Sequence, residues 1–251
     1  MLEFCDVAVS YDKKPVLEQI RFPLKEHRLT VLLGRNDSGK STLVGALNQR
    51  IPYTGQILLH GKDVSAMRPK DRAKQIAVLP QVLSAPHILV EELVAFGRSP
   101  YLDLTGRLTA EDRKLVDKAI ADSEVEDLRG RFVDTLSGGE RQRVYLAMIL
   151  AQNTPIVILD EPTAHMDQQH EAAFLRCLQK LKPEKTFLVI LHDLTLAAQF
   201  ADELAVIDRH KLVYAGEREK CLEQGILEKT FSVRKYVLEQ DGQRLTFFSA
   251  V

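Results

Sequence analysis

One glycine-rich stretch constrains the fold of this chain more than any other part of it. Residues 34–42 follow an apolar run, residues 30–33, and open a helical pattern with Leu43 and Leu47 on its apolar side. Strand, tight loop and helix in this order, with the spacing G-x-x-x-x-G-K-S, form the context of a phosphate-binding loop. Glycine lets the backbone curl so that several N–H groups point inward, toward the positive end of the helix. The stretch therefore predicts an α/β fold with an anion site at a strand–helix turn.

Individual residues of this loop have predicted roles. Lys40 reaches the β- and γ-phosphates of a nucleotide, and the Ser41 hydroxyl binds Mg²⁺. The alternative, a plain glycine-rich turn, is disfavoured by the strand–helix context and by later motifs with matching chemistry. The predicted nucleotide-binding residues of the loop are Gly34, Arg35, Asn36, Asp37, Ser38, Gly39, Lys40, Ser41 and Thr42.

Composition limits what surrounds the loop. A chain of 251 residues, 45% hydrophobic, fits one large α/β domain or two small ones, and a net charge of −1 gives no general attraction to nucleic acid. Three widely spaced cysteines form no metal or disulfide pattern. Residues 1–4 lack the regions of a signal peptide, and no apolar run approaches the roughly 18 residues of a membrane span. Any role at a membrane is therefore expected to come through a partner.

The pattern before and after the loop predicts two further parts. Residues 2–9 and 16–24 read as strands separated by a polar turn that contains Tyr11, whose ring either covers a sheet edge or stacks on a nucleobase. From about residue 82 the periodicity becomes helical and the surface more charged. We expect a single domain over residues 1–251, with a helical subdomain at about 82–137 inserted between two strands of the core.

A second glycine-containing element precedes another helix. Ser137 is a good N-cap, and Gly138 and Gly139 leave backbone N–H groups open at the helix start. The helix is expected to run to about Gln152. This is a second anion site, and one nucleotide does not obviously need both. A dimer explains it if the second site closes on a nucleotide held by another copy.

Two apolar runs of strand length end in residues that carry chemistry. One is followed by Asp160 and Glu161, and the other, residues 187–191, by His192. Ligand sites in parallel sheets lie at the carboxyl ends of strands. We therefore expect Asp160 beside the phosphate loop, holding Mg²⁺ through water, and Glu161 polarising an attacking water. A lone histidine is more often structural, but at this strand end we favour a γ-phosphate contact for His192.

The rest of the C-terminal half carries less chemistry. His165 and His170 are five residues apart, which suits neither one helix face nor zinc, so we interpret them as surface residues. Residues 204–207 and 212–215 predict a final hairpin. The tail from residue 219 reads as a helix followed by short strands.

Taken in order, these motifs resemble the ATP-binding cassette (ABC) ATPases of membrane transporters over essentially the whole chain. The element LSGGERQR at residues 136–143 is close to diagnostic, whereas the phosphate loop is shared by many NTPases. The insertion narrows the resemblance to the ATPase subunits of ferric-siderophore, ferric-citrate, haem and cobalamin importers. The segments that look like this branch are AFGRSPY at 95–101, GRLT at 106–109, MILAQNTP at 148–155 and TFSV at 230–233.

The resemblance implies roles for particular residues. It implies that Tyr11 stacks on adenine, that Gln81 contacts Mg²⁺ and reports the nucleotide state to the insertion, and that Asp167 couples two sites across a dimer. It also implies that residues after Gln81, through about Arg98, receive a helix of a transmembrane subunit. The signature residues implied to bind ATP held by the opposite subunit are Ser137, Gly138, Gly139 and Glu140.

The implied function is ATP hydrolysis, with ATP and Mg²⁺, by a head-to-tail homodimer at the cytoplasmic face of the cell membrane. Its partners are then the permease subunits of an importer and, indirectly, a substrate-binding receptor, without nucleic acid. The implied cargo is an iron(III)-siderophore or a related iron, haem or cobalamin chelate. The alternative is a soluble ATPase of the same class that acts in iron–sulfur cluster assembly or another process outside transport. A regulator without turnover is disfavoured because Glu161 and His192 are both present.

Two loop residues depart from this family. Asp37 stands where glycine is usual, and Arg35 where proline is common. Aspartate tolerates a left-handed backbone better than most residues. Its carboxylate repels phosphate unless it points away, so we expect Asp37 to face water or to pair with Arg35.

Overall fold

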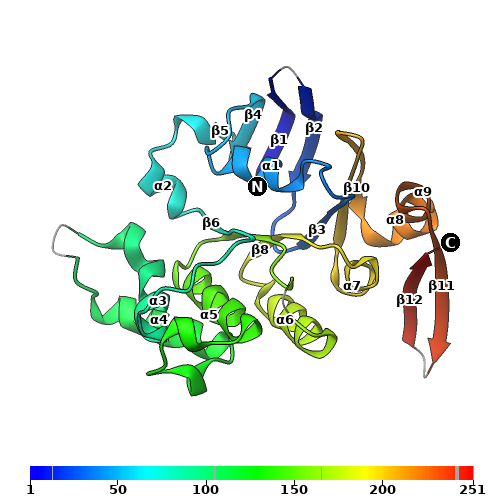
Figure 1. Cartoon of the computed structure of the whole chain (residues 1–251). Helices are drawn as coiled ribbons and strands as arrows, with labels where there is room; N and C mark the ends of the chain where they lie inside the picture. Colours follow the sequence, from blue (N-terminus) through cyan, green and yellow to red (C-terminus); the bar gives the residue numbers. More distant parts are fainter. Residues whose placement is uncertain (13, 104–105, 165, 241–242, 251) are drawn as a thin grey trace. The chain divides into compact units, whose positions relative to one another are not determined.

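The structure, a computed structural model, describes residues 1–12, 14–103, 106–164, 166–240 and 243–250 (Figure 1). The chain folds as two compact units, the first Met1–Ala66 with Thr186–Val251 and the second Met67–Lys185. His165 and Lys13 lie outside the described residues, so the surface interpretation of His165 is not tested. The prediction of one domain with an insertion at about 82–137 stays a prediction.

The predicted N-terminal strands of the first unit form an antiparallel sheet. β1 (Leu2–Tyr11) pairs with β2 (Lys14–Leu24) on one side and with β4 (Thr54–Leu59) on the other, as Figure 1 shows. The short β5 (Lys62–Asp63) pairs with β4 at the edge. Apolar side chains alternate along β1 and are buried at those positions, which is why the sequence pattern predicted a half-buried strand.

Strands buried on both faces form the centre of the same sheet. β3 (Leu29–Gly34) lies between its parallel neighbours β8 (Thr186–Ile190) and β9 (Glu203–Asp208). Such strands read as continuous apolar runs, as predicted here. β10 (Lys211–Glu217) pairs antiparallel with β9, which confirms the C-terminal hairpin. The strand order within this unit is β5-β4-β1-β2-β10-β9-β3-β8.

The tail of the first unit contains one more helix than the sequence predicted. Two short helices replace the single predicted one, because Gly225, with φ of 63°, ends one and begins the next. The final strands then pair only with each other as a separate hairpin. The elements are α1 (Lys40–Leu47), α7 (Leu194–Phe200), α8 (Arg218–Glu223), α9 (Ile226–Phe231), β11 (Val233–Gln240), β12 (Gln243–Ala250) and a 3₁₀ turn at Val64–Ala66.

The second unit combines a parallel strand pair with helices. β6 (Ile76–Leu79) and β7 (Ile156–Asp160) are parallel neighbours. Its helices are α2 (Pro69–Ala73), α3 (Val90–Ala95), α4 (Ala110–Asp122), α5 (Gly138–Ala151) and α6 (Gln168–Leu181), with 3₁₀ turns at Phe96–Tyr101, Glu126–Leu128 and Val133–Thr135. Ser137 caps α5, as the sequence predicted, and Thr109 caps α4.

One buried arginine, Arg98, forms hydrogen bonds to two helices of the second unit, α4 and α5. The Arg98 Nε donates to Asp112 Oδ1 at 2.9 Å, and its Nη1 donates to the Ala151 carbonyl at 2.9 Å. Beside it, a Cβ added at Gly97 would lie 2.1 Å from the Met148 carbonyl oxygen, so only glycine fits. These contacts join α4, α5 and the Phe96–Tyr101 turn, and they give a packing reason for the glycine and arginine of the insertion motif.

Candidate nucleotide site

The phosphate loop follows β3 in a backbone path that requires glycine at two positions. A Cβ added at Gly34 would lie 2.3 Å from the Ser38 Oγ, and one added at Gly39 would lie 2.6 Å from Leu17 Cδ2. Gly39 also has φ of 96°, and Asp37 has φ of 62°, both in the left-handed region. The loop is therefore as tightly curled as the sequence predicted, and Asp37 takes the conformation expected of an aspartate there.

The Lys40 side chain is held by the loop that surrounds it. Its Nζ donates to the carbonyl oxygens of Gly34, at 2.9 Å, and Arg35, at 3.0 Å. The Ser38 N–H donates to the same Arg35 carbonyl at 3.2 Å. Because Lys40 is only 5% exposed, its ammonium is fixed in direction and largely shielded from water. Such an ammonium is suited to bind an anion that enters the loop.

The loop also contains a buried polar atom whose hydrogen-bonding capacity is not satisfied. Within the part of the chain that the structure describes, the Ser38 Oγ is buried without a hydrogen-bond partner. A buried hydroxyl without a partner costs free energy, and a phosphate oxygen would satisfy it. Together with the Lys40 ammonium and the curled backbone, this hydroxyl makes the loop fit the phosphates of ATP.

The two unusual loop residues do not pair with each other. Asp37 is exposed, in agreement with the expectation that it faces water. The Arg35 guanidinium instead donates to the Thr230 carbonyl at 2.9 Å and to the Ser232 Oγ at 3.2 Å. The suggested Asp37–Arg35 pair is therefore wrong. No sequence pattern could reveal this contact, because it joins positions almost the whole chain apart.

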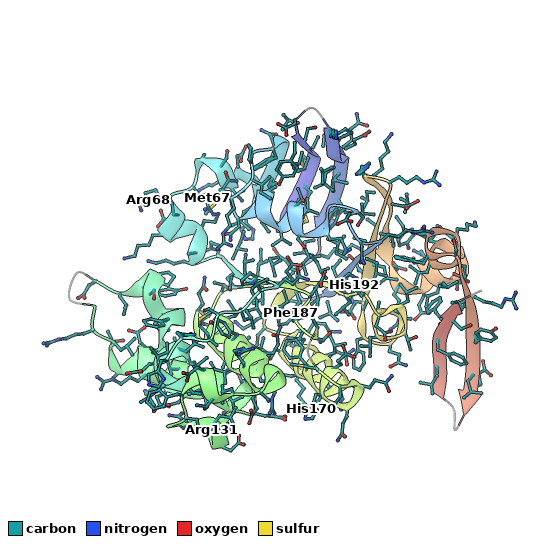
Figure 2. The ribbon with its side chains drawn as sticks, viewed as in Figure 1. Met67, Arg68, Arg131, His170, Phe187 and His192 are labelled. Atoms are coloured by element: carbon teal, nitrogen blue, oxygen red, sulfur yellow. The ribbon has the colours of Figure 1, made fainter. Side chains whose placement is uncertain are left out.

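Two further predicted residues of the first unit are exposed. Tyr11 is 47% exposed, and it pairs with Lys14 as the last residue of β1. His192 follows β8, in which Phe187 lies, and Figure 2 labels both residues. Asp193 next to it accepts from the N–H groups of Thr195 and Leu196 and caps α7. The adenine contact of Tyr11 and the γ-phosphate contact of His192 stay predictions.

In the second unit, two acidic residues lie at the end of β7, and one of them, Glu161, contacts Gln81. Asp160 ends the strand and is 6% exposed, while Glu161 turns the chain with φ of 49°. The Gln81 Nε2 donates to the Glu161 Oε2 at 2.5 Å. The sequence did not predict this contact, since the resemblance implied for Gln81 only a contact with Mg²⁺ and a report of the nucleotide state to the insertion. The contact places an amide beside the carboxylate that is predicted to polarise water.

The signature helix begins with a closed capping box. The Ser137 Oγ accepts from the Glu140 N–H at 3.3 Å, and the Glu140 carboxylate accepts from the Ser137 N–H at 2.7 Å and from Arg131, labelled in Figure 2, at 2.8 Å. The Ser137 N–H and then Arg131 hold the pKa of Glu140 below its usual value. Among the described residues, a Cβ added at Gly139 would meet Met166 Cγ, at 3.8 Å, so the backbone there is not crowded. Glu140 therefore shapes the start of α5.

Asp167 is held by the histidine three residues later. Its Oδ1 accepts from the backbone N–H of His170, which Figure 2 labels, at 2.9 Å and lies 2.7 Å from the His170 Nδ1. The backbone hydrogen bond, followed by the ring contact, lowers the pKa of Asp167. His170 lies on the surface, as interpreted from the sequence, but it also orients Asp167. The three-residue spacing after an N-cap aspartate was the available signal for this.

Among the residues that the structure describes, no three or more His, Cys, Asp and Glu side chains are grouped to hold a metal ion. The predicted Mg²⁺ ligands, Ser41, Gln81 and Asp160, contribute one carboxylate and two neutral oxygen donors. Mg²⁺ bound with phosphates commonly uses such a set, completed by water.

Comparison with known proteins decides the family. Residues 17–164, more than half of the chain, match the family model described as ABC transporter. The chain belongs to the ABC transporter ATP-binding subunits. It is 35% identical over 237 residues to the ferric enterobactin transport ATP-binding protein of Escherichia coli (strain K12), covering 93% of this chain and 88% of that protein. It is 32% identical over 254 residues to the petrobactin import ATP-binding protein of Bacillus subtilis (strain 168), and the match covers 99% of this chain and 100% of that protein.

A solved structure supports the fold of this ABC subunit. A metal-chelate type ABC transporter in an inward-facing conformation matches with a TM-score of 0.86 at 22% identity, covering 100% of this chain and 97% of that chain. Subunits of this family bind ATP and hydrolyse it to power transport, and this ABC subunit is such an ATPase. No helix in the described residues is long and apolar enough to cross a membrane.

Proposed function

We propose that this ABC subunit powers the import of an iron(III)-siderophore or of a related iron, haem or cobalamin chelate. The observation that carries this proposal is the end-to-end match to subunits named for petrobactin import and ferric enterobactin transport. The relatives reported above give no support to the alternative, a soluble ATPase of iron–sulfur cluster assembly.

The proposed assembly contains two copies of the chain, bound to permease subunits at the cytoplasmic face of the cell membrane. ATP-binding subunits of importers work with transmembrane permeases, and a substrate-binding receptor would deliver the chelate from outside. The surface after Gln81 supports a docking role, because Val82 is 84% exposed and Phe96 is 57% exposed. Both apolar side chains are therefore accessible to a partner.

In the proposed mechanism, the first unit binds the nucleotide. Lys40 pairs with the β- and γ-phosphates, and the backbone N–H groups of the loop and the Ser38 hydroxyl donate to phosphate oxygens. The exposed Tyr11 ring stacks on adenine, and His192 contacts the γ-phosphate. Binding thus replaces the carbonyl partners that Lys40 now has with charged oxygens, which a buried ammonium binds more strongly.

The second unit would supply the groups that act on water and on a second copy. Glu161 orients and polarises the attacking water, and the Gln81 amide already donates to Glu161. Mg²⁺ would be held by Gln81, by Asp160 through water, and by Ser41 of the first unit, and its charge would offset that of the phosphates. In the dimer, the start of α5 in one copy binds the γ-phosphate held by the other, and Asp167 couples the two sites.

Uptake of labelled chelates tests the proposed function. In the source organism, a strain without this gene should lose uptake of ⁵⁵Fe from at least one of a panel of siderophores, ferric citrate and haem, or uptake of labelled cobalamin. The wild-type gene should restore that uptake, and Glu161→Gln, which keeps the nucleotide-binding loop intact, should not. Normal uptake of every compound in the deleted strain would contradict the import function.

A further inference from the structure

Arg35 links the phosphate loop to the C-terminal segment of the first unit. Its two donors, Nε and Nη2, reach a backbone carbonyl, Thr230 O at 2.9 Å, and a hydroxyl, Ser232 Oγ at 3.2 Å. Both acceptors lie at the end of α9, which stops at Ser232 because that residue has φ of 58°. The last carbonyl groups of a helix lack partners within the helix and attract cations. The guanidinium therefore completes the C-terminal end of α9.

The backbone of the same residue is part of the phosphate loop itself. The Arg35 carbonyl accepts from the Ser38 N–H at 3.2 Å and from the Lys40 Nζ at 3.0 Å. Any displacement of this peptide group changes the position of the Lys40 ammonium and the curl of the loop. One residue thus connects the C-terminal segment, through its side chain, to the group that meets phosphate, through its carbonyl.

The chemistry of the contact requires arginine in particular. Its planar fork presents two donors in fixed directions, and both acceptors here are neutral, so the contact depends on geometry as well as on charge. Thr230 is only 8% exposed, which places its carbonyl in a shielded position. A non-proline residue in a tight loop has no ring to restrict its φ angle. The two hydrogen bonds supply a restraint that the backbone at position 35 lacks.

We propose that Arg35 is a positioning residue of the phosphate loop, and that the end of α9, through Thr230 and Ser232, sets the affinity of this loop for ATP. The inference rests on the proposed role of the loop in binding ATP. It assigns a function to the C-terminal segment, for which the sequence offered no chemistry.

Equilibrium titration with ATP in EDTA, which prevents hydrolysis, tests the inference, together with steady-state kinetics in Mg²⁺. Arg35→Ala should raise the Kd for ATP about tenfold, as expected for losing two hydrogen bonds from a charged donor, while kcat stays within about twofold. Arg35→Lys keeps the charge but not the fork, so it should bind within about threefold of Arg35→Ala. Arg234→Ala, an exposed arginine of the same segment, is the matched control and should bind as wild type.

A double-mutant cycle tests the connection from the other side. Ser232→Ala should weaken ATP binding about threefold in the wild-type background and not at all in the Arg35→Ala background. Any other pattern in the cycle, or wild-type affinity in Arg35→Lys, would overturn the inference. Lys40→Ala in the same titration separates the two proposals. If Lys40→Ala abolishes binding while Arg35→Ala binds normally, only this inference fails, whereas normal binding by Lys40→Ala refutes the ATP-binding loop itself.

Discussion

Removal of the Arg98 side chain should cost the protein about 3 kcal/mol of unfolding free energy. Arg98 is 5% exposed, donates to Asp112 and to the Ala151 carbonyl, and lies 3.9 Å from the centre of the Tyr101 ring. Removing one partner of a buried ion pair costs about 3–5 kcal/mol. The lower end applies because Asp112 keeps its bonds from the N–H and hydroxyl of Thr109.

Urea unfolding followed by circular dichroism measures this loss in Arg98→Ala. The matched control is Arg68→Ala, labelled in Figure 2, which removes an arginine 84% exposed that pairs with Asp71 in the same unit. An exposed pair contributes little, so the control should unfold at the same urea concentration as wild type. A loss below about 1 kcal/mol for Arg98→Ala, with an unchanged urea dependence, would refute the reasoning.

The same measurement has a pH dependence with a definite sign. The Thr109 hydroxyl, its N–H and then Arg98 hold the pKa of Asp112 below its usual value. A folded-state pKa that is lowered stabilises the protein above the unfolded value of about 3.9, and this stabilisation disappears as pH falls through the folded value. Asp112→Asn should therefore be less stable than wild type at pH 7, and the difference should shrink below about pH 4. A difference independent of pH would contradict this account of the pair.

Three further predictions concern the nucleotide. Lys40→Ala should abolish ATP binding and hydrolysis, because it removes the ammonium that the loop holds; normal affinity in a titration would refute the site. Asp37→Gly and Asp37→Asn should change ATP affinity less than about threefold, because the carboxylate is exposed and screened; a tenfold gain in both, shrinking with salt, would show that it faces the phosphates. If the two composite sites fire independently, mixed Ser137→Arg and Lys40→Ala subunits should regain ATPase activity that neither has alone, measured by phosphate release; a wild-type monomer active at full rate at high dilution would contradict the shared sites.

Local patterns predicted the parts of this structure that local physics determines. The apolar runs became β3, β7 and β8, because strands buried on both faces need no polar alternation. Ser137 and Thr109 cap helices, because the hydroxyl and the acid three residues later satisfy each other's N–H groups.

Contacts between distant segments could not be predicted in this way. Arg35 and Thr230 lie at opposite ends of the chain, and the Gln81–Glu161 hydrogen bond joins two strand ends. The need for Gly97 comes from the Met148 carbonyl, which only the packed helices bring close. Each of these depends on tertiary packing, whereas the capping contact of His170 with Asp167 was local and was available in the sequence.

The Glu161→Gln variant tests the central claim most directly, namely that this chain hydrolyses ATP with Glu161 as the group that activates water. Glutamine has the same size as glutamate and can still contact Gln81, but it lacks the carboxylate that acts as the base. With ATP and Mg²⁺, the purified variant should bind nucleotide as wild type, release phosphate roughly 10²–10⁴ times more slowly, and elute as a dimer in size-exclusion chromatography. Turnover equal to that of wild type, or a variant that stays monomeric with ATP, would contradict the account.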